Sequence, residues 1–129
     1  MKKNIFKQDS SIKPKKQGSD SQKNKVNWPK KVIKDIKDQI SDNKVLLFMK
    51  GSPYQPQCGF SSKVAQILFS YDVEFSYIDV LEFPEVRANL PKISDWPTFP
   101  QLFVDGELVG GCDIITEMHE GDELSTLLT

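Results

Sequence analysis

The chain has 129 residues, of which 38% are hydrophobic and 27% are charged, a balance typical of one globular domain. Residues 1–27 hold eight lysines and two aspartates, a charge of +6, and the total of −1 therefore leaves −7 for residues 28–129. This acidic part argues against a general role in binding nucleic acid. No apolar run approaches the roughly 20 residues of a membrane helix, and no apolar stretch typical of a secretory signal follows the basic start.

Thiols and imidazoles are few in this chain. Cys58 and Cys112 are the only cysteines, and His119 is the only histidine. Two cysteines are too few for a disulfide scaffold, and the whole set is too small for a self-contained zinc or iron site. Any metal held through a thiolate must therefore recruit ligands from outside the chain.

The basic segment, residues 1–27, contains few large apolar side chains among many Lys, Ser, Gln and Asn residues. Such a segment cannot bury enough surface to offset the entropy of ordering, so we expect a disordered tail at 1–27 and a folded domain at 28–129. A cytoplasmic protein is expected. A transit peptide for the mitochondrion or plastid is the alternative, although the segment lacks Arg and contains Asp9 and Asp20. Contact with an anionic surface is a third interpretation.

The first predicted elements are a helix, a strand and a second helix. Helical spacing of apolar residues predicts a helix that begins near Pro29 and contains Val32, Ile33, Ile36 and Ile40. Residues 45–49 are all apolar and predict a buried strand. A loop rich in Gly and Pro then leads to Cys58, and a second helix follows with the apolar stripe Val64, Ile67, Leu68 and Tyr71.

The second half predicts three strands and two helices. Residues 73–80 alternate as a strand, and Pro84 begins a short helix that runs through Leu90. Strands at 101–104 and 107–109 are joined by Asp105-Gly106, a strong signal for a tight antiparallel hairpin because the turn needs positive φ. A last helix is expected at 113–119.

This order of elements determines the expected fold class. A strand–helix–strand unit gives two parallel strands, and the hairpin adds an antiparallel pair. The sequence therefore predicts an α/β, thioredoxin-like fold: a four-stranded mixed sheet flanked by helices on both faces.

Cys58 is the first candidate for chemistry. It follows a strand and a loop and precedes a helix, so its sulfur should lie at the positive end of that helix, where thiolate is favoured over thiol. Lys50 at the end of the preceding strand adds a second positive influence. Nucleophilic attack and metal ligation both require a thiolate. The alternative is a buried structural cysteine, against which the loop and Gly59 argue because they indicate exposure.

Ser61 stands three residues after Cys58, at the position where a second thiol would complete a Cys-x-x-Cys pair. Such a pair could reduce a disulfide by itself, because the second thiol resolves the mixed disulfide. Ser61 cannot do so. The intermediate must then be released by an external thiol, or the site serves another purpose.

Two segments that begin or follow strands are candidate ligand sites. If the bond before Pro100 is cis, the backbone of Phe99 turns outward and can pair with an extended peptide; the alternative is a rigid loop with no ligand. Gly110 and Gly111 precede a helix whose free N–H groups suit a carboxylate. An ordinary turn capped by Asp113 is the alternative there, and spacing alone favours it.

Arg87, on the short helix after Pro84, is by itself more typical of a solvated surface residue. A guanidinium binds a carboxylate through two hydrogen bonds, so Arg87 becomes a candidate ligand where an anionic molecule lies nearby. His119 is interpreted as a surface group and is assigned no role.

Four motifs occur together in the order Lys50-Gly51-Ser52, Cys58-Gly59-Phe60-Ser61, residues 96–101 (WPTFPQ) and residues 104–113 (VDGELVGGCD). Over about residues 30–128 the chain resembles the monothiol, or CGFS-type, glutaredoxins. Residues 53–57 resemble the longer loop that these proteins carry before the active cysteine, a feature associated with cluster binding more than with disulfide reduction.

This resemblance implies a glutathione site. Lys50 and Arg87 match cations that face the glycine carboxylate of glutathione, and Phe99 matches the residue that pairs with its cysteinyl backbone. Cys112 and Asp113 match the pair that holds its glutamyl end.

The resemblance also implies a [2Fe–2S] cluster ligated by Cys58 and by glutathione, shared between two subunits of a homodimer. A BolA-like protein and recipient apoproteins are the expected partners, with no nucleic acid and no membrane. The enzymatic alternative is a glutathione-dependent thiol–disulfide oxidoreductase that removes glutathione from mixed disulfides, with Cys58 as the attacking group; such activity is expected to be weak at most. A thioredoxin-like interaction module without chemistry is the third interpretation. The sequence leaves open whether Cys112 pairs with Cys58, because pairing depends on their Cα separation.

Overall fold

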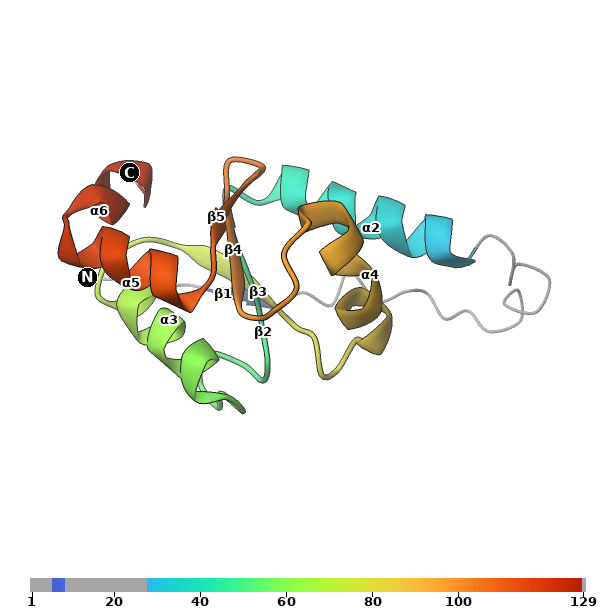
Figure 1. Cartoon of the computed structure of the whole chain (residues 1–129), viewed down its shortest axis with the longest axis horizontal. Helices are drawn as coiled ribbons and strands as arrows, with labels where there is room; N and C mark the ends of the chain where they lie inside the picture. The colour runs from blue at the N-terminus through green and yellow to red at the C-terminus, as the bar shows by residue number, and fades with distance from the viewer. Residues whose placement is uncertain (1–5, 9–27, 129) are drawn as a thin grey trace.

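The computed structural model describes residues 6–8 and 28–128. Its strands are β1 (Phe6–Gln8), β2 (Val45–Met49), β3 (Phe75–Asp79), β4 (Gln101–Val104) and β5 (Glu107–Gly110). Its helices are α2 (Trp28–Asp42), α3 (Gly59–Phe69), α4 (Pro84–Ser94), α5 (Cys112–Glu120) and α6 (Glu123–Leu128). The strands form one mixed sheet in the order β1-β3-β2-β4-β5, with helices on both faces (Figure 1).

The four predicted strands pair as the sequence indicates. β2 lies parallel to β3, with Leu46 opposite Ser76, and antiparallel to β4, with Leu47 opposite Leu102. β4 and β5 form the predicted hairpin, and its turn residues Asp105 and Gly106 have φ values of 52° and 85°. The predicted thioredoxin-like fold, with a four-stranded mixed sheet between helices, is therefore confirmed.

Two apolar cores lie on opposite faces of this sheet. Because successive side chains of a strand point to opposite faces, Val45, Leu47 and Met49 pack toward α3, α5 and α6. Leu46 and Phe48 pack toward α2 and α4 on the other face. Figure 1 shows the two groups of helices on either side of the strands. The central strand is thus buried on both faces, which explains why it is apolar throughout.

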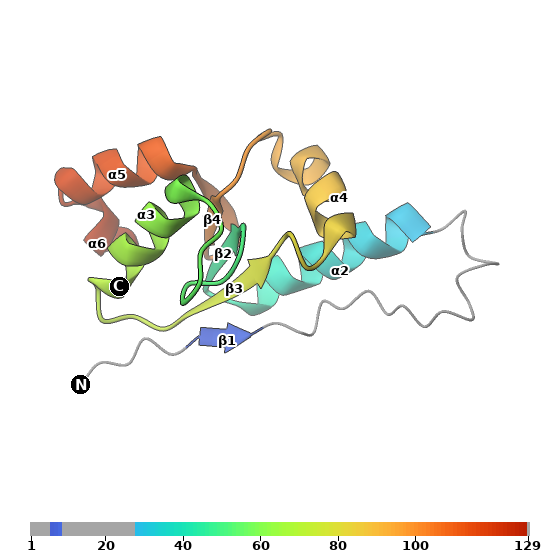
Figure 2. The same cartoon turned by 90° about the horizontal axis from the view of Figure 1, so that it is seen from below.

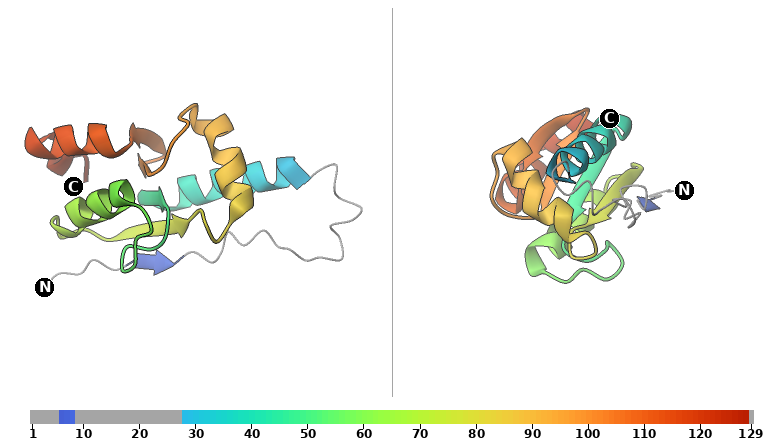
Figure 3. Two further views of the ribbon diagram at one scale, coloured as in Figure 1. Left: turned by 60° about the horizontal axis from the view of Figure 1, so that its bottom comes forward. Right: turned by 90° about the vertical axis from the view of Figure 1, so that its right-hand side faces the viewer.

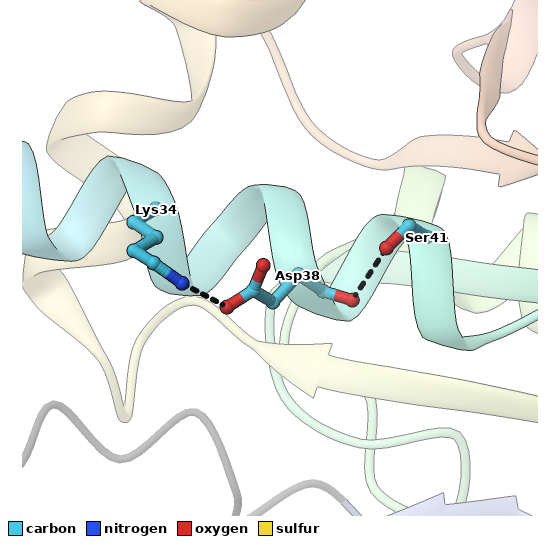
Figure 4. Close-up of polar contacts among 3 residues, drawn as sticks. All are labelled: Lys34, Asp38 and Ser41. Atoms are coloured by element: carbon cyan, nitrogen blue, oxygen red, sulfur yellow. Dashed lines mark hydrogen bonds and ion pairs between the residues drawn. The ribbon is translucent and has the colours of Figure 1, made fainter.

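The α2 helix is held by its apolar side. Val32, Ile36 and Ile40 are buried at a spacing of four residues, as predicted. On the outer side, Lys34 Nζ lies 3.0 Å from Asp38 Oδ2, and the Ser41 hydroxyl donates to the Asp38 carbonyl at 3.2 Å (Figure 4). An ion pair this exposed adds little to stability, so burial of the apolar side fixes the helix. In Figure 3, α4 packs across α2, while α3 lies beside α5 on the opposite face.

Several boundaries differ from the sequence prediction. α3 ends at Phe69, so Tyr71 lies beyond the helix, although it still packs against the core. α4 continues past Leu90 to Ser94, because Pro91 removes only one helical N–H and the chain turns at Asp95, where φ is 60°. The predicted strand at 73–80 is shorter, Phe75–Asp79.

Two elements were not predicted. α6 packs on α5 and buries Leu124 and Leu128 in the core that also holds residues of α3 and the sheet. β1 lies within the segment expected to be disordered, and it pairs in parallel with the edge strand β3, from Phe6 opposite Phe75 to Gln8 opposite Tyr77 (Figure 2). The remainder of residues 1–27 lies outside the described residues, so the disorder expected there stays a prediction. None of the described helices has the length and apolar character needed to cross a membrane.

Candidate functional site

The topology brings four segments to one end of the sheet. The loop to Cys58 follows β2, and α4 follows β3. Because β4 runs antiparallel to both β2 and β5, the start of β4 meets the ends of those two strands. The four segments surround a cavity of about 550 Å³, which lies within the range of roughly 300–1,000 Å³ typical of small-ligand sites. All six predicted site residues line it: Lys50, Cys58, Arg87, Phe99, Cys112 and Asp113.

The loop before Cys58 is compact and depends on Gly51. The Gln57 N–H donates to the Lys50 carbonyl at 2.9 Å, and this bond closes the base of the loop. Gly51 has φ of 89°, and a Cβ there would lie 2.6 Å from both the Gln55 oxygen and the Gln57 nitrogen. Only glycine fits this position, since both the backbone conformation and the available space exclude a side chain.

Asp79 ties the same loop to the end of β3. Its Oδ1 accepts hydrogen bonds from the N–H groups of Gly51 and Leu81, each at 2.9 Å. The carboxylate therefore fixes the segment that carries Cys58 relative to the segment that leads into α4. This role of Asp79 was not predicted from the sequence, where an acidic side chain at a strand end was the available signal.

Cys58 is the N-cap residue of α3, with an extended backbone at φ −155° and ψ 136°. Its thiol is half-buried, and burial alone raises the pKa of a thiol. The N–H groups of Ser61 and Phe60 in the first turn of α3, the Ser61 hydroxyl and the charge of Lys50 together outweigh burial, so the Cys58 pKa lies below its ordinary value. The site therefore favours the thiolate, the form that attacks sulfur or ligates a metal.

Ser61 has a role that sequence reasoning missed. Its side chain is fully buried, and its Oγ accepts a hydrogen bond from the Lys50 N–H at 3.1 Å. The hydroxyl proton is thereby free to point at the Cys58 sulfur, where it favours the thiolate. Ser61 thus joins the end of β2, the start of α3 and the thiol. The signal was a hydroxyl in the first turn of the helix that follows the cysteine.

The second wall of the cavity is formed by residues 96–100. The Phe99–Pro100 peptide bond is cis. The predicted pairing of the Phe99 backbone with an extended peptide depended on this isomer. Phe99 is half-buried and Pro100 is buried at the start of β4.

The third wall is the beginning of α5, where Gly111 is the N-cap residue. Cys112 is half-buried, and its Sγ lies 4.0 Å from Thr116 Oγ1, while Asp113 is exposed. Both Cys58 and Cys112 are free thiols. His119 faces elsewhere: its Nδ1 lies 2.6 Å from the Tyr71 hydroxyl oxygen.

The charges around the cavity suit an anionic ligand. Lys50 and Arg87 both line it, and within residues 6–8 and 28–128 neither forms an ion pair with a carboxylate. Asp113 lines it as well and offers a carboxylate at the start of α5. The described residues contain no cluster of three or more His, Cys, Asp or Glu side chains able to hold a metal ion. A metal in this cavity would therefore bind Cys58 and complete its ligand set from other molecules.

Fold and cavity together define a thioredoxin-fold protein in which the Cys58 thiol, with its lowered pKa, lies in a cavity that Lys50 and Arg87 also line. The sequence model of the glutaredoxin family matches residues 45–109. Glutaredoxin 4 of Haemophilus influenzae (strain 86-028NP) is 56% identical over 93 residues, which cover 72% of this chain and 87% of that protein. Glutaredoxin 4 of Escherichia coli K12 is 54% identical over 96 residues, which cover 74% and 84%.

A solved structure is similar as well. The solution structure of reduced poplar apo GrxS14 has a TM-score of 0.65 and 44% identity, and the match covers 74% of this chain and 87% of that one. The chain therefore belongs to the glutaredoxin family, in its monothiol branch, since Ser61 replaces the second thiol after Cys58.

Proposed function

We propose that this protein binds glutathione in the cavity and, through Cys58 and the glutathione thiolate, carries a [2Fe–2S] cluster to recipient apoproteins. The observation that supports this proposal most strongly is the Cys58 thiol of lowered pKa in an open cavity. The described part of the chain has no group of three or more His, Cys, Asp or Glu side chains that could hold a metal ion without outside ligands. Names of the relatives are consistent with the same class of protein.

Glutathione fits the distribution of charge in the cavity. Its glycine carboxylate would pair with Lys50 and Arg87, the two cations on one side. The main chain of Phe99 would pair with the cysteinyl residue in the manner of an added strand. Cys112 and Asp113 would hold the glutamyl end, where free N–H groups at the start of α5 suit its carboxylate and the Asp113 carboxylate suits its ammonium group.

The cluster is the cargo of this protein, and its ligand count implies a dimer. A [2Fe–2S] cluster is held by four ligands. One chain provides Cys58 and one bound glutathione provides a second thiolate, so two such halves complete the set in a cluster-bridged homodimer. If a BolA-like protein replaced one subunit and its glutathione, the assembly would be a cluster-bridged heterodimer. Because half of the ligands belong to a diffusible tripeptide, release to an apoprotein is easy.

A second function is favoured by the same thiolate. As a glutathione-dependent oxidoreductase, Cys58 would attack the glutathione sulfur of a mixed disulfide and release the substrate thiolate. A second glutathione would then attack the Cys58–glutathione disulfide, restore the Cys58 thiolate and leave as oxidised glutathione. Ser61 cannot supply the resolving thiol, so in this scheme the external glutathione supplies it.

Anaerobic reconstitution with iron, sulfide and glutathione separates the two functions. We expect a brown protein with the visible absorption of a [2Fe–2S] centre, and light scattering should show a dimer that becomes monomeric when the cluster is lost. The Cys112→Ser variant is the matched control, since it removes the other free thiol of the cavity. Rapid turnover on a glutathionylated peptide, together with no chromophore after reconstitution, would instead establish the oxidoreductase.

A further inference from the structure

Gln101, the first residue of β4, is a fully buried polar side chain outside the lining of the cavity. Its Nε2 donates to two main-chain carbonyl oxygens, those of Trp96 at 3.0 Å and Thr98 at 3.1 Å. Its Oε1 is buried and has no hydrogen-bond partner in the described part of the chain. An unpaired buried acceptor is unfavourable, so an apolar side chain would suit this position better if the two donated bonds served no purpose.

These two bonds hold the wall of the cavity that carries Phe99. Residues 95–100 belong to no helix or strand, so the sheet and the helices do not fix their course. Gln101 donates to carbonyl groups at both sides of Pro97 and thereby fixes the turn that delivers the Phe99 main chain to the groove.

Trp96 extends this support to the opposite wall. A Cβ atom on Gly111 would lie 3.1 Å from Trp96 Nε1 and 3.2 Å from the Pro100 carbonyl oxygen, so the indole packs directly against the start of α5. The Trp96 Nε1 atom is buried and has no hydrogen-bond partner among the described residues. Packing, and not a hydrogen bond, therefore holds the indole ring against the start of α5. The turn fixed by Gln101 and the helix start that carries Cys112 therefore touch through Trp96.

We propose that Gln101 is a positioning residue for the tripeptide groove, and that it sets the separation between the Phe99 main chain and the start of α5 through the 96–98 turn and the Trp96 ring. This inference rests on the proposed binding of glutathione. It gives a role in glutathione binding to a side chain that does not line the cavity.

Replacement of Gln101 by methionine tests the proposal, because methionine has a similar length and no donor. The matched control is Gln66→Met, since Gln66 is exposed on α3 and its Nε2 donates only to the Ser62 hydroxyl at 3.3 Å. We expect the dissociation constant of glutathione, measured by calorimetry on iron-free protein, to rise about tenfold in Gln101→Met and to stay unchanged in Gln66→Met.

The pH profile of Cys58 alkylation, without glutathione, separates positioning from general loosening. The groups that lower the Cys58 pKa belong to Lys50, Phe60 and Ser61, not to the 96–98 turn. The profile of Gln101→Met should therefore match that of the wild type. Unchanged glutathione affinity would overturn the inference, and so would a loss of affinity accompanied by a displaced alkylation profile. If the wild-type protein itself binds no glutathione, the proposed function fails first, and the inference fails with it.

A second pair of variants keeps the proposal testable if Gln101→Met does not fold. Gly111→Ala should weaken glutathione binding, because its Cβ presses on Trp96 Nε1 and on the Pro100 carbonyl oxygen, and one wall must shift slightly from the other. In a Trp96→Phe background, where Nε1 is absent, the same substitution should raise the dissociation constant of glutathione by a factor at least three times smaller than in the wild-type background. Equal losses in the two backgrounds would show that Trp96 does not set the separation of the two walls.

Discussion

The starts of α3 and α5 both present a cysteine to the same cavity, yet they give the two sulfur atoms different surroundings. Cys58 is the N-cap residue of α3, and the N–H groups of Phe60 and Ser61, the second and third residues of that helix, help to lower the pKa of its thiol. Cys112 stands one position later relative to its helix, after the N-cap Gly111, and its Sγ lies 4.0 Å from Thr116 Oγ1. At the N-cap, Cys58 faces the first N–H groups of its helix, and this position favours its thiolate.

The largest effect expected from this comparison is the contrast between Cys58→Ser and Cys112→Ser. The first should abolish cluster assembly and rapid alkylation while leaving the fold intact, because Cys58 is half-buried at a loop–helix junction and not part of either core. The second should retain both properties, because the N–H group of residue 112, which serine keeps, is the proposed contact of glutathione, and not the Cys112 thiol. Absorption spectra after reconstitution and far-ultraviolet circular dichroism of both variants provide the measurement. A Cys58→Ser protein with an unchanged [2Fe–2S] spectrum would refute the ligand assignment.

The next effect concerns the Ser61 hydroxyl at the start of α3, which has no counterpart at the start of α5. Ser61→Ala should raise the Cys58 pKa, since a hydrogen bond to the thiolate is lost. It should also lower the free energy of unfolding by about 1–3 kcal/mol, because the Lys50 N–H loses its acceptor. Ser62→Ala is the control, since Ser62 is the next residue of the helix and its Oγ only accepts from exposed Gln66. Urea unfolding and the pH profile of alkylation measure the two effects, and equal behaviour of the two variants would contradict the assignment.

The same pKa determines how stability changes with pH. A thiol with a lowered pKa in the folded state loses its proton at a lower pH than it does in the unfolded chain. Between these two pKa values the unfolded state binds more protons, so the free energy of unfolding should rise with pH through that window. The added stability is present above the unfolded pKa and is lost as pH falls through the folded pKa. Ser61→Ala should flatten this rise, whereas Cys112→Ser should leave it in place.

A smaller effect is expected from Lys50, the other basic group of the α3 start. Lys50→Met should raise the Cys58 pKa less than Ser61→Ala does, because the charge of a half-exposed ammonium contributes least among the groups that lower it. Its larger consequence should be a weaker affinity for glutathione. The alkylation profile should also shift more at low than at high ionic strength. A shift larger than that of Ser61→Ala would show that charge, not hydrogen bonding, sets the reactivity of Cys58.

Sequence patterns predicted those features that depend on neighbouring residues. The apolar run 45–49 indicated a central strand, Asp105-Gly106 indicated the hairpin, and the resemblance to the monothiol glutaredoxins indicated residues that all line one cavity. Tertiary contacts decided the rest. Asp79 reaches Gly51 across 28 positions of sequence, and Ser61 reaches Lys50 across 11. No local pattern encodes such partners.

The unpredicted elements have the same explanation. The six residues of α6 form a helix too short to be stable alone, and burial of Leu124 and Leu128 supplies the stability. β1 comprises three residues, and its pairing depends on the exposed edge of β3. Neither contact is visible in the sequence around the element that makes it.

The smallest effect is expected from removal of residues 1–27, which deletes β1. Among the described residues, the cavity is lined by those between Lys50 and Ile114, and β1 pairs with the opposite edge of the sheet from β5, so neither helix start loses a contact with β1. Alkylation profiles of both cysteines and cluster assembly should therefore stay unchanged. Pairing of three residues at a sheet edge contributes little, and we expect the melting temperature to fall by no more than about 5 °C, equivalent to roughly 1 kcal/mol for a domain of this size. A shorter truncation that removes only residues 1–5 keeps β1 and is the matched control for this comparison. A larger fall confined to the longer truncation would show that β1 stabilises the edge of β3, and an accompanying change in the Cys58 profile would show that this edge communicates with the start of α3.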